Sequence, residues 1–326
     1  MSIRSGVLFS AVVFAVASLA PIPSVAQAKH GWAPGLTLDG QPDLQGNWVN
    51  KGATPLERPK QLEGRESLTD AEVAELKARA VRIFAGGNSD AANGDAVFLA
   101  ALANVEQYKS ENATGLTLFL DRDFDNRTSL IVDPPDGKIP AYTPQGQKRR
   151  AAEVKATNMR TPPNRMEDMT PFQRCITFGV PMPRPGPFTS FYQIVQSPGY
   201  VVVVMEAIHD ARIIPLDGRP HLPQNIRVWN GDSVGHWEGK TLVVDTTNFS
   251  PQSNFMGSAE NLHLVERFTR VAQDEIRYEF TVDDPTTWTK PWTAVIRLKH
   301  TDEKIFESAC HEGNFRIMED MLKSAK

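Results

Sequence analysis

The sequence lacks several short motifs that mark well-known classes of enzyme. It contains no glycine-rich phosphate-binding loop, no H-E-x-x-H motif and no C-x-x-C motif. Nucleotide sites, helical zinc sites and thioredoxin-like redox centres depend on those spacings. The absences therefore count against a nucleotide-dependent enzyme, a zinc protease and a thioredoxin-like protein. The tripeptide Cys310-His311-Glu312 is not a haem attachment site, because such a site needs C-x-x-C-H.

Long apolar runs are also scarce, and the one that stands out lies at the N-terminus. Arg4 precedes the apolar stretch from Gly6 to Ala20, and Ala26-Gln27-Ala28 follows it. A positive start, an apolar core and an A-x-A pattern are typical of a secretory signal peptide. The run is shorter than the roughly 20 residues that span a bilayer, so a cleaved leader over residues 1–28 is favoured over a membrane anchor. We expect a periplasmic or secreted protein with no membrane span after cleavage.

Cysteine is rare, and net charge is small. Cys175 and Cys310 are the only cysteines, and in an oxidising compartment a disulfide between them is the plain interpretation; two free thiols are the alternative. The net charge is −4, and it becomes −5 when Arg4 leaves with the leader. Nothing in this balance indicates a nucleic-acid partner, so a small molecule is the expected substrate or ligand.

The remaining chain divides into two unlike parts, a loop-rich region with a few helices over residues 29–180 and a strand-rich domain over residues 181–326. Thr69 and Glu72 have the capping-box spacing at the start of one expected helix. A second helix is expected over 96–108. Thr143 followed by Pro144 predicts the start of a third. Between the last two, 129–132 is expected as a short strand, followed by a turn at 134–137.

The second part alternates short apolar segments with turns. Eight strands are expected, over 191–195, 201–207, 211–214, 241–248, 262–271, 275–282, 293–300 and 305–310. Short strands with tight turns and no helices between them predict an antiparallel sandwich or barrel. Their sequential order favours a mainly β fold with an up-and-down barrel.

Several segments are familiar in combination: PDLQGNW (42–48), TPLERP (54–59), SLIVDPPDGKIP (129–140), HDARIIPLDGRPH (209–221), HWEGKTLVVDTTNF (236–249), NLHLVERFTR (261–270), DPTTWTKPW (284–292) and ACHEGN (309–314). Together they resemble a family of exported, mostly hypothetical bacterial proteins, across nearly the whole chain after the leader. The resemblance implies export and a shared architecture, and it implies no particular activity. Gly46-Asn47-Trp48 also has the G-x-W form found at the first strand of lipocalins, so the barrel is expected to be lipocalin-like.

The densest group of polar residues lies in HDARIIPLDGRPH. His209 and His221 are candidates for a general acid or base, with Asp210 as an orienting carboxylate. Arg212 and Arg219 are candidates for binding substrate oxygens. The alternative is that the aspartates and arginines form ion pairs that stabilise turns.

A second group lies on the expected strand 262–271. Because side chains alternate along a strand, His263 and Arg267 share one face and Glu266 lies on the other. We expect His263 and Arg267 to point into the barrel, as a catalytic residue and a substrate-binding residue. Glu266 is expected to be either a buried acid with a raised pKa or the partner of an arginine elsewhere.

Three further residues complete the candidate site. His311 follows Cys310 and would be held rigidly by a disulfide, which suits substrate binding. Trp288 and Trp292 lie near strand ends and could rim a pocket for a sugar, an aromatic ring or a lipid; the alternative is that they cover the end of the barrel.

These candidates lead to two hypotheses of different class. The first is an exported hydrolase, lyase or isomerase that performs acid–base chemistry on a small organic molecule without a cofactor. The second is a periplasmic, lipocalin-like binding protein with a dry cavity for an apolar or aromatic ligand. Zinc is a further alternative, because histidines and aspartates are its usual ligands, although their spacing matches no zinc signature: His209, His221, His263 and His311 with Asp210 or Asp232.

Overall fold

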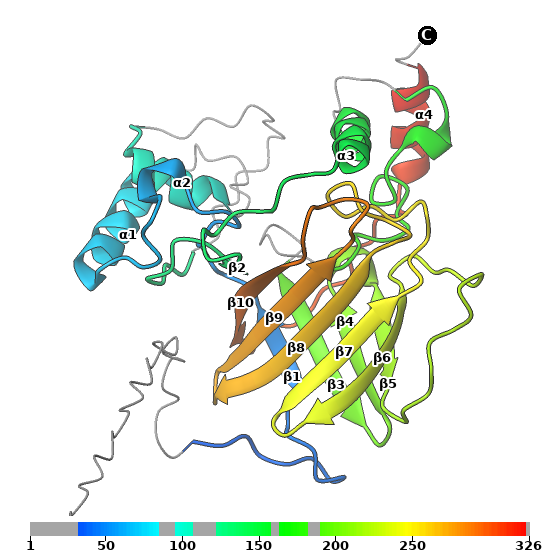
Figure 1. Cartoon of the computed structure of the whole chain (residues 1–326), viewed down its shortest axis with the longest axis horizontal. Helices are drawn as coiled ribbons and strands as arrows, with labels where there is room; N and C mark the ends of the chain where they lie inside the picture. The colour runs from blue at the N-terminus through cyan, green and yellow to red at the C-terminus, as the bar shows by residue number, and fades with distance from the viewer. Residues whose placement is uncertain (1–31, 85–94, 107–121, 158–162, 182–189, 324–326) are drawn as a thin grey trace, which may run out of the picture.

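The computed structural model describes residues 32–84, 95–106, 122–157, 163–181 and 190–323, and its centre is an antiparallel β-barrel (Figure 1). The leader expected over residues 1–28 lies outside the described residues. Within those ranges, no helix combines the length and the apolar character needed to cross a bilayer.

Nine strands form the barrel in the order β5, β4, β3, β1, β10, β9, β8, β7, β6. β5 and β6 lie side by side at the two ends of this order without strand hydrogen bonds, so the barrel is nearly closed. A short tenth strand, β2, pairs with the outer edge of β10. The strands are β1 (Gly46–Val49), β2 (Ile131–Asp133), β3 (Phe191–Ser197), β4 (Tyr200–Met205), β5 (Ala211–Pro215), β6 (Asp232–Glu238), β7 (Thr241–Thr247), β8 (His263–Ala272), β9 (Glu275–Asp283) and β10 (Trp292–His300).

The predicted barrel is confirmed, with two corrections to its strands. The segment 305–310 was expected as a strand and has no regular structure up to the turn at Cys310, while β6 was not expected. β6 is inconspicuous in the sequence because Gly235 interrupts it. Gly235 is needed there, since a Cβ at that position would lie 2.9 Å from Ile214 and 2.8 Å from Leu216.

β1 completes the barrel from the N-terminal part of the chain. It pairs antiparallel with β3 on one side and with β10 on the other, with Trp48 opposite Tyr192 and His300. The indole of Trp48 is fully buried and donates a hydrogen bond to the Leu44 carbonyl at 2.9 Å. The guanidinium of Arg270 lies 5.2 Å from its ring centroid, within the range of a cation–π contact. The G-x-W segment therefore anchors one end of the barrel.

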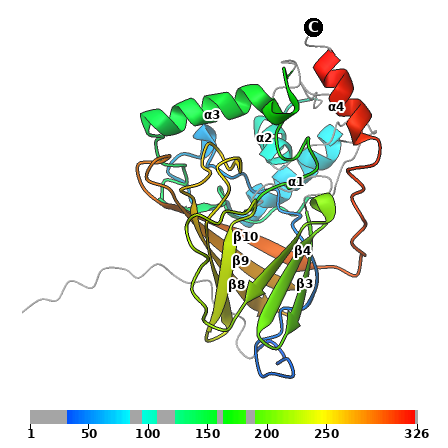
Figure 2. The ribbon, with the colours of Figure 1, turned by 90° about the vertical axis from the view of Figure 1, so that its right-hand side faces the viewer.

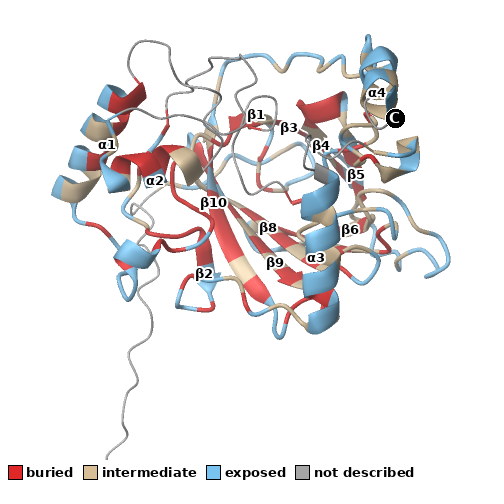
Figure 3. Cartoon of the chain, turned by 90° about the horizontal axis from the view of Figure 1, so that it is seen from above, coloured by how far each residue is buried: buried red, intermediate tan, exposed pale blue. Residues whose placement is uncertain are grey.

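The helices gather at one end of the barrel (Figure 2). They are α1 (Asp70–Phe84), α2 (Asp95–Ala103), α3 (Pro144–Thr157) and α4 (Asn314–Lys323). The predicted caps of α1 and α3 are confirmed: Glu72 N–H donates to Thr69 Oγ1 at 3.3 Å, and Gly146 N–H donates to Thr143 Oγ1 at 3.0 Å. α1 and α2 share a small core of their own, whereas α3 and α4 are largely exposed (Figure 3). α4 was not expected.

The barrel core consists of the inward side chains of its strands. On β8, Leu264, Glu266 and Phe268 share one face, as the alternation predicted, and this face is the buried one. His263 and Arg267 face outward, contrary to the expectation. Trp288 and Trp292 close one end, with ring centroids 5.8 Å apart, and Trp292 stacks on Phe255. Aromatic side chains consequently occupy much of this end of the barrel interior.

The predicted disulfide is present. Cys175 and Cys310 are bonded, which ties the extended segment after β10 to the loop that precedes β3. A second contact lies beside it, where Asn314 Nδ2 donates to the Gln173 carbonyl at 2.9 Å. The segment from 301 to 323 is mostly exposed, and these two contacts hold its end, while hydrogen bonds of Thr301 and Glu303 with Asn47 hold its start.

Replacing both cysteines with serine should lower the free energy of unfolding by about 2–4 kcal/mol, because the bond closes a span of 135 residues and restricts the unfolded chain. Denaturant unfolding of the double variant and of the wild type under reducing conditions measures this. The two should agree, and an unchanged midpoint in both would contradict the expected stabilisation.

Candidate functional site

A buried polar cluster lies inside the barrel and joins five strands. Arg212 of β5 donates to both carboxylate oxygens of Glu266 on β8, at 3.0 and 2.6 Å, and Tyr278 of β9 donates to Glu266 Oε1 at 2.7 Å. Arg212 also donates to Ser233 Oγ on β6 at 3.0 Å and to Thr246 Oγ1 on β7 at 3.3 Å. Of the two roles expected for Glu266, the structure shows the partner of an arginine.

The charges of this cluster are fixed by burial and by pairing. Burial would lower the pKa of Arg212, but the adjacent Glu266 raises it above its ordinary value. Burial and the Glu266 carboxylate together raise the pKa of Tyr278 well above 10. The result is a stable ion pair with a neutral phenol beside it. The Glu266 carboxylate accepts three hydrogen bonds within the cluster, which use most of its roughly four acceptor positions.

The space next to this cluster is small. A cavity of about 20 Å³ is lined mainly by apolar side chains, with Arg212, Glu266 and Tyr278 at its polar side. That volume holds about one water molecule. This cavity is smaller than the dry cavity that the hypothesis of a lipocalin-like binder for an aromatic ligand predicts.

A second polar cluster lies on the outer face of the barrel. His221, in the segment between β5 and β6, contacts Asp232 Oδ2 through Nδ1 and Asp245 Oδ1 through Nε2, both at 2.9 Å. Asp245 Oδ2 contacts His263 Nε2 at 2.8 Å. His221 can donate to both carboxylates at once only when both of its ring nitrogens carry protons. His263 was expected to point into the barrel, so its position on the outer face is a correction.

The pKa values of the pair at the centre of this cluster shift in opposite directions. The hydrogen bond to Asp245 raises the pKa of His263, and the charge of Asp283 adds to that effect. The hydrogen bond from His263 lowers the pKa of Asp245, against the effect of burial. Both shifts describe one ion pair, which is partly exposed to solvent.

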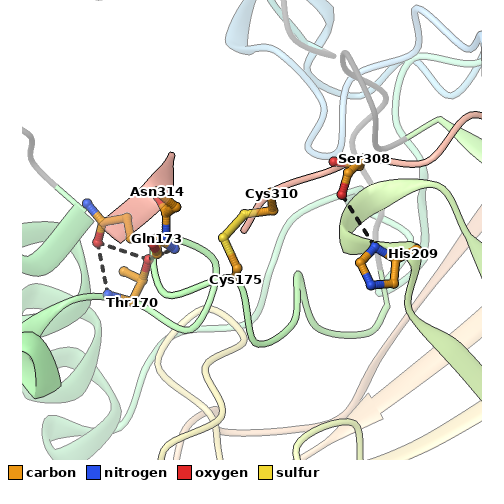
Figure 4. The surroundings of a disulfide bond; sticks show 7 residues. All are labelled: Thr170, Gln173, Cys175, His209, Ser308, Cys310 and Asn314. Atoms are coloured by element: carbon orange, nitrogen blue, oxygen red, sulfur yellow. Dashed lines mark hydrogen bonds between the residues drawn. A yellow bond between two sulfur atoms is a disulfide. The ribbon is translucent and has the colours of Figure 1, made fainter. Parts of the chain in front are cut away.

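The expected pair of His209 and Asp210 is not formed. Asp210 accepts hydrogen bonds from Thr177 and from Asn230, each at 2.6 Å, instead of orienting His209. His209 is exposed, and its Nδ1 lies 3.4 Å from the Ser308 carbonyl beside the disulfide (Figure 4). The ring centroids of His209 and His311 are 6.5 Å apart, so the structure brings these two candidates near each other at the C-terminal segment 301–323.

The remaining candidates lie apart from one another. Arg219 pairs with Asp217 at an exposed turn, and Arg267 pairs with Glu238 on the outer face, both at 2.6 Å. Trp288 and Trp292 are buried in the barrel core. The candidate residues therefore lie in the barrel interior, on the outer face of the barrel and near the C-terminal segment 301–323. They do not line one common pocket.

The sequence contains one further spacing of catalytic interest. Gly231-Asp232-Ser233-Val234-Gly235 has the G-x-S-x-G form, in which a nucleophilic serine sits on a turn between a strand and a helix. Ser233 instead lies within β6, inside the barrel, and Arg212 donates to it. Its surroundings are those of a buried structural serine.

A second cavity, larger than the one inside the barrel, was not predicted. It has a volume of about 200 Å³ and lies where the outer face of β10 meets the residues after β1 and the segment 122–130. Its walls are Asn50, Gly52, Asp123, Phe124, Asp125, Arg127, Leu130, Ile296, Arg297 and Lys299. Gly52 forms a parallel bridge with Asp123, and this bridge holds the two N-terminal walls together. The sequence gives no local sign of this site, because its residues come from three distant segments.

The charged walls of this cavity are already paired with one another. Asp125 accepts hydrogen bonds from Arg127 at 2.7 and 2.9 Å and from Thr54 at 2.9 Å. Burial opposes ionisation of Asp125, but Arg127 lowers its pKa below the ordinary value. Behind the cavity, Glu275 accepts hydrogen bonds from Arg297 and Lys299, each at 2.7 Å.

Two wall groups remain available. Asp123 is exposed, and no described side chain donates a hydrogen bond to its carboxylate. Asn50 is 2 % exposed, and its Nδ2 has no hydrogen-bond partner among the described residues.

In the part of the chain that the structure describes, no group of three or more histidine, cysteine, aspartate or glutamate side chains is arranged to hold a metal ion. Comparison with protein-family models, with curated proteins and with solved structures gave no match.

Removing one member of the buried ion pair should be costly. Glu266→Leu is expected to lower the free energy of unfolding by about 3–5 kcal/mol, because it leaves the Arg212 charge buried without its partner. The double variant Arg212→Met, Glu266→Leu should recover most of that loss. Urea unfolding of both variants tests this, and equal stability of the two would contradict the ion-pair account.

The outer cluster should make stability depend on pH. Since the folded pKa of His263 is raised above 6.5, its contribution is complete below pH 6.5 and is lost as the pH rises through the folded value. Since the folded pKa of Asp245 lies below 3.8, its contribution is lost only as the pH falls below that value. His263→Gln should therefore cost more at pH 6 than at pH 9, by less than about 1 kcal/mol because the pair is partly exposed. In an Asp245→Asn background this difference should shrink to the small part that Asp283 contributes, and an undiminished difference would assign it to other groups.

Proposed function

We propose that the protein is an exported binding protein that holds a small polar molecule in the 200 Å³ cavity beside β10. The observation that carries the proposal is the contrast between the two cavities, because the barrel interior has room for about one water molecule. A concave site with an apolar floor and a few well-placed polar groups is typical of small-molecule binding.

The positions of the expected catalytic residues support binding over acid–base catalysis. Glu266 is tied to Arg212 and Tyr278, His263 lies on the outer face, and Asp210 binds Thr177 and Asn230. An acid–base mechanism needs a proton donor and acceptor within reach of one substrate. Catalysis by these residues stays a prediction from the sequence.

The frame around the cavity is suited to a preformed site. β10 lies between β1 and β9 in the sheet, and Arg297 and Lys299 on its outer face are held by Glu275. A site on a rigid strand loses little conformational entropy when a ligand binds. The disulfide supports a location outside the cytoplasm, where such bonds persist.

A variant that fills the cavity tests this function. Gly52 lines the cavity, its φ is not in the left-handed region, and an added Cβ would make only an ordinary contact with Asn50 Oδ1 at 3.4 Å. Gly52→Leu should therefore fold normally and block the site. Gly35→Leu is a matched control, because a Cβ there meets nothing within 4 Å.

The measurement is thermal unfolding of the three proteins with a library of small polar compounds. A ligand at 100 times its Kd stabilises the folded state by about 2.7 kcal/mol, a shift of several degrees. Compounds that shift the wild type and Gly35→Leu should fail to shift Gly52→Leu. Equal shifts in all three proteins would place binding elsewhere and overturn the proposal.

A further inference from the structure

We propose that residues 216–231 form a strap across the seam between β5 and β6, which the charged form of His221 holds closed and which loosens when His221 loses a proton. This inference does not depend on the cavity beside β10, because β10 lies in the middle of the strand order and the seam lies at its two ends. It follows from the path of the strap, from its few contacts and from the two carboxylates that His221 joins.

The strap runs along the outside of the seam from one end of the barrel to the other (Figure 1). At its start, Leu216 N–H donates to the Gly199 carbonyl in the turn between β3 and β4, at 2.8 Å. At its end, Asn230 Nδ2 donates at 2.6 Å to Asp210, which directly precedes β5. The strap thus returns to the end of the barrel at which β5 begins. Because β5 and β6 share no strand pairing in the described sheet, the strap covers a gap in the ring of strands.

The middle of the strap is weakly packed. Between residues 217 and 226, every residue except His221 is exposed. Two further contacts lie directly beside His221: Leu222 N–H donates to Asp232 Oδ2 at 2.8 Å, and Asn248 Nδ2 donates to the Leu222 carbonyl at 2.7 Å. The attachment of this exposed stretch to β6 and β7 is therefore concentrated at two neighbouring residues, and His221 is the one that carries a titratable side chain.

The contacts of His221 require a charged ring. Its Nδ1 lies 2.9 Å from Asp232 Oδ2, and its Nε2 lies 2.9 Å from Asp245 Oδ1. An imidazolium donates to both carboxylates, whereas a neutral imidazole has one N–H and directs a lone pair from its other nitrogen. Loss of the proton therefore turns one of the two contacts from attractive to repulsive. Asp232 and Asp245 belong to β6 and β7, and His221 follows β5, so the contact that is lost is one that spans the seam.

The neighbouring charges set the direction of the pH response. The charged side chains around His221 and its carboxylates come from the adjacent strands and from the strap: Asp232, Asp245, His263, Asp283, Asp217, Arg219 and Arg227. On the strap, Arg219 pairs with Asp217. Asp245 keeps its charge where histidines titrate, because the hydrogen bond from His263 lowers its pKa. The contacts of His221 are consequently complete at mildly acidic pH and are reduced as the pH rises.

Hydrogen exchange of the full mature protein, followed by mass spectrometry between pH 5.5 and pH 8.5 and corrected for the intrinsic effect of pH, tests the strap. We expect the protection of peptides that contain Leu222 to fall at least about tenfold as the pH rises, which is the effect of losing one charge-assisted hydrogen bond. β9 is paired on both sides and should keep its protection over the same range.

Two substitutions of His221 should fix the strap in one state or the other. His221→Arg keeps a charge that does not titrate and can donate to both carboxylates, so the strap should stay protected at every pH. His221→Gln carries no charge, so protection should be low and independent of pH. His236→Gln is a matched control, because it removes another histidine of the outer face that contacts a carboxylate, that of Glu238, and it should keep the wild-type response.

The outcomes separate the two histidines that contact Asp245. His263→Gln should keep the pH response; if it abolishes the response while His221→Gln retains it, the strap is held by His263 and the inference is overturned. A strap in the wild type whose protection does not change with pH overturns it as well. Nitrogen-15 NMR of the wild-type imidazole is an independent check without any variant. Both ring nitrogens of His221 should be protonated at pH 5.5, and a neutral ring there contradicts the inference.

Discussion

The barrel depends on a single buried guanidinium that reaches across its open seam. β5 and β6 are neighbours without strand hydrogen bonds, and Arg212 on β5 bonds to Ser233 on β6, Thr246 on β7 and Glu266 on β8. On the outer face, His221 follows β5 in the chain and contacts Asp232 and Asp245 on β6 and β7. Side-chain hydrogen bonds on both surfaces thus take the place of a missing backbone ladder. Several histidines and carboxylates that suggest catalysis in the sequence therefore form the hydrogen bonds that join β5 to its neighbours across this seam.

The seam also explains why the cavity beside the buried ion pair is small. A charge pair can stay buried only if its remaining hydrogen bonds are satisfied and water is kept out. Aromatic rings and the small size of the inner cavity meet that condition, and they leave little room for a ligand. The outer face of β10 and residues of the N-terminal region together enclose a cavity that is larger than the cavity beside the buried ion pair.

The sequence allowed prediction of the features that depend on local pattern. Alternation on β8 placed Glu266 opposite His263, and the Thr69 and Thr143 caps set two helix starts. The alternation did not reveal which face of β8 points into the barrel. Both faces carry polar residues, and alternation alone does not say which of two faces is buried. β6 was missed because close packing against Ile214 and Leu216 requires a glycine. The cavity beside β10 could not be predicted from local sequence patterns, because Asn50, Asp123 and Arg297 come together only in the tertiary structure.

The place of β1 in the barrel has a consequence for when this chain can fold. Residues 46–49 pair with residues 299 and 300 as well as with β3, so the ring of strands cannot close until nearly the whole polypeptide has been made. Contacts between such distant parts of a chain form slowly. A precursor emerging from the ribosome therefore lacks its final partner strand and stays open throughout synthesis. For the exported protein that we propose, delayed closure would keep the chain in an extended form that can be transported.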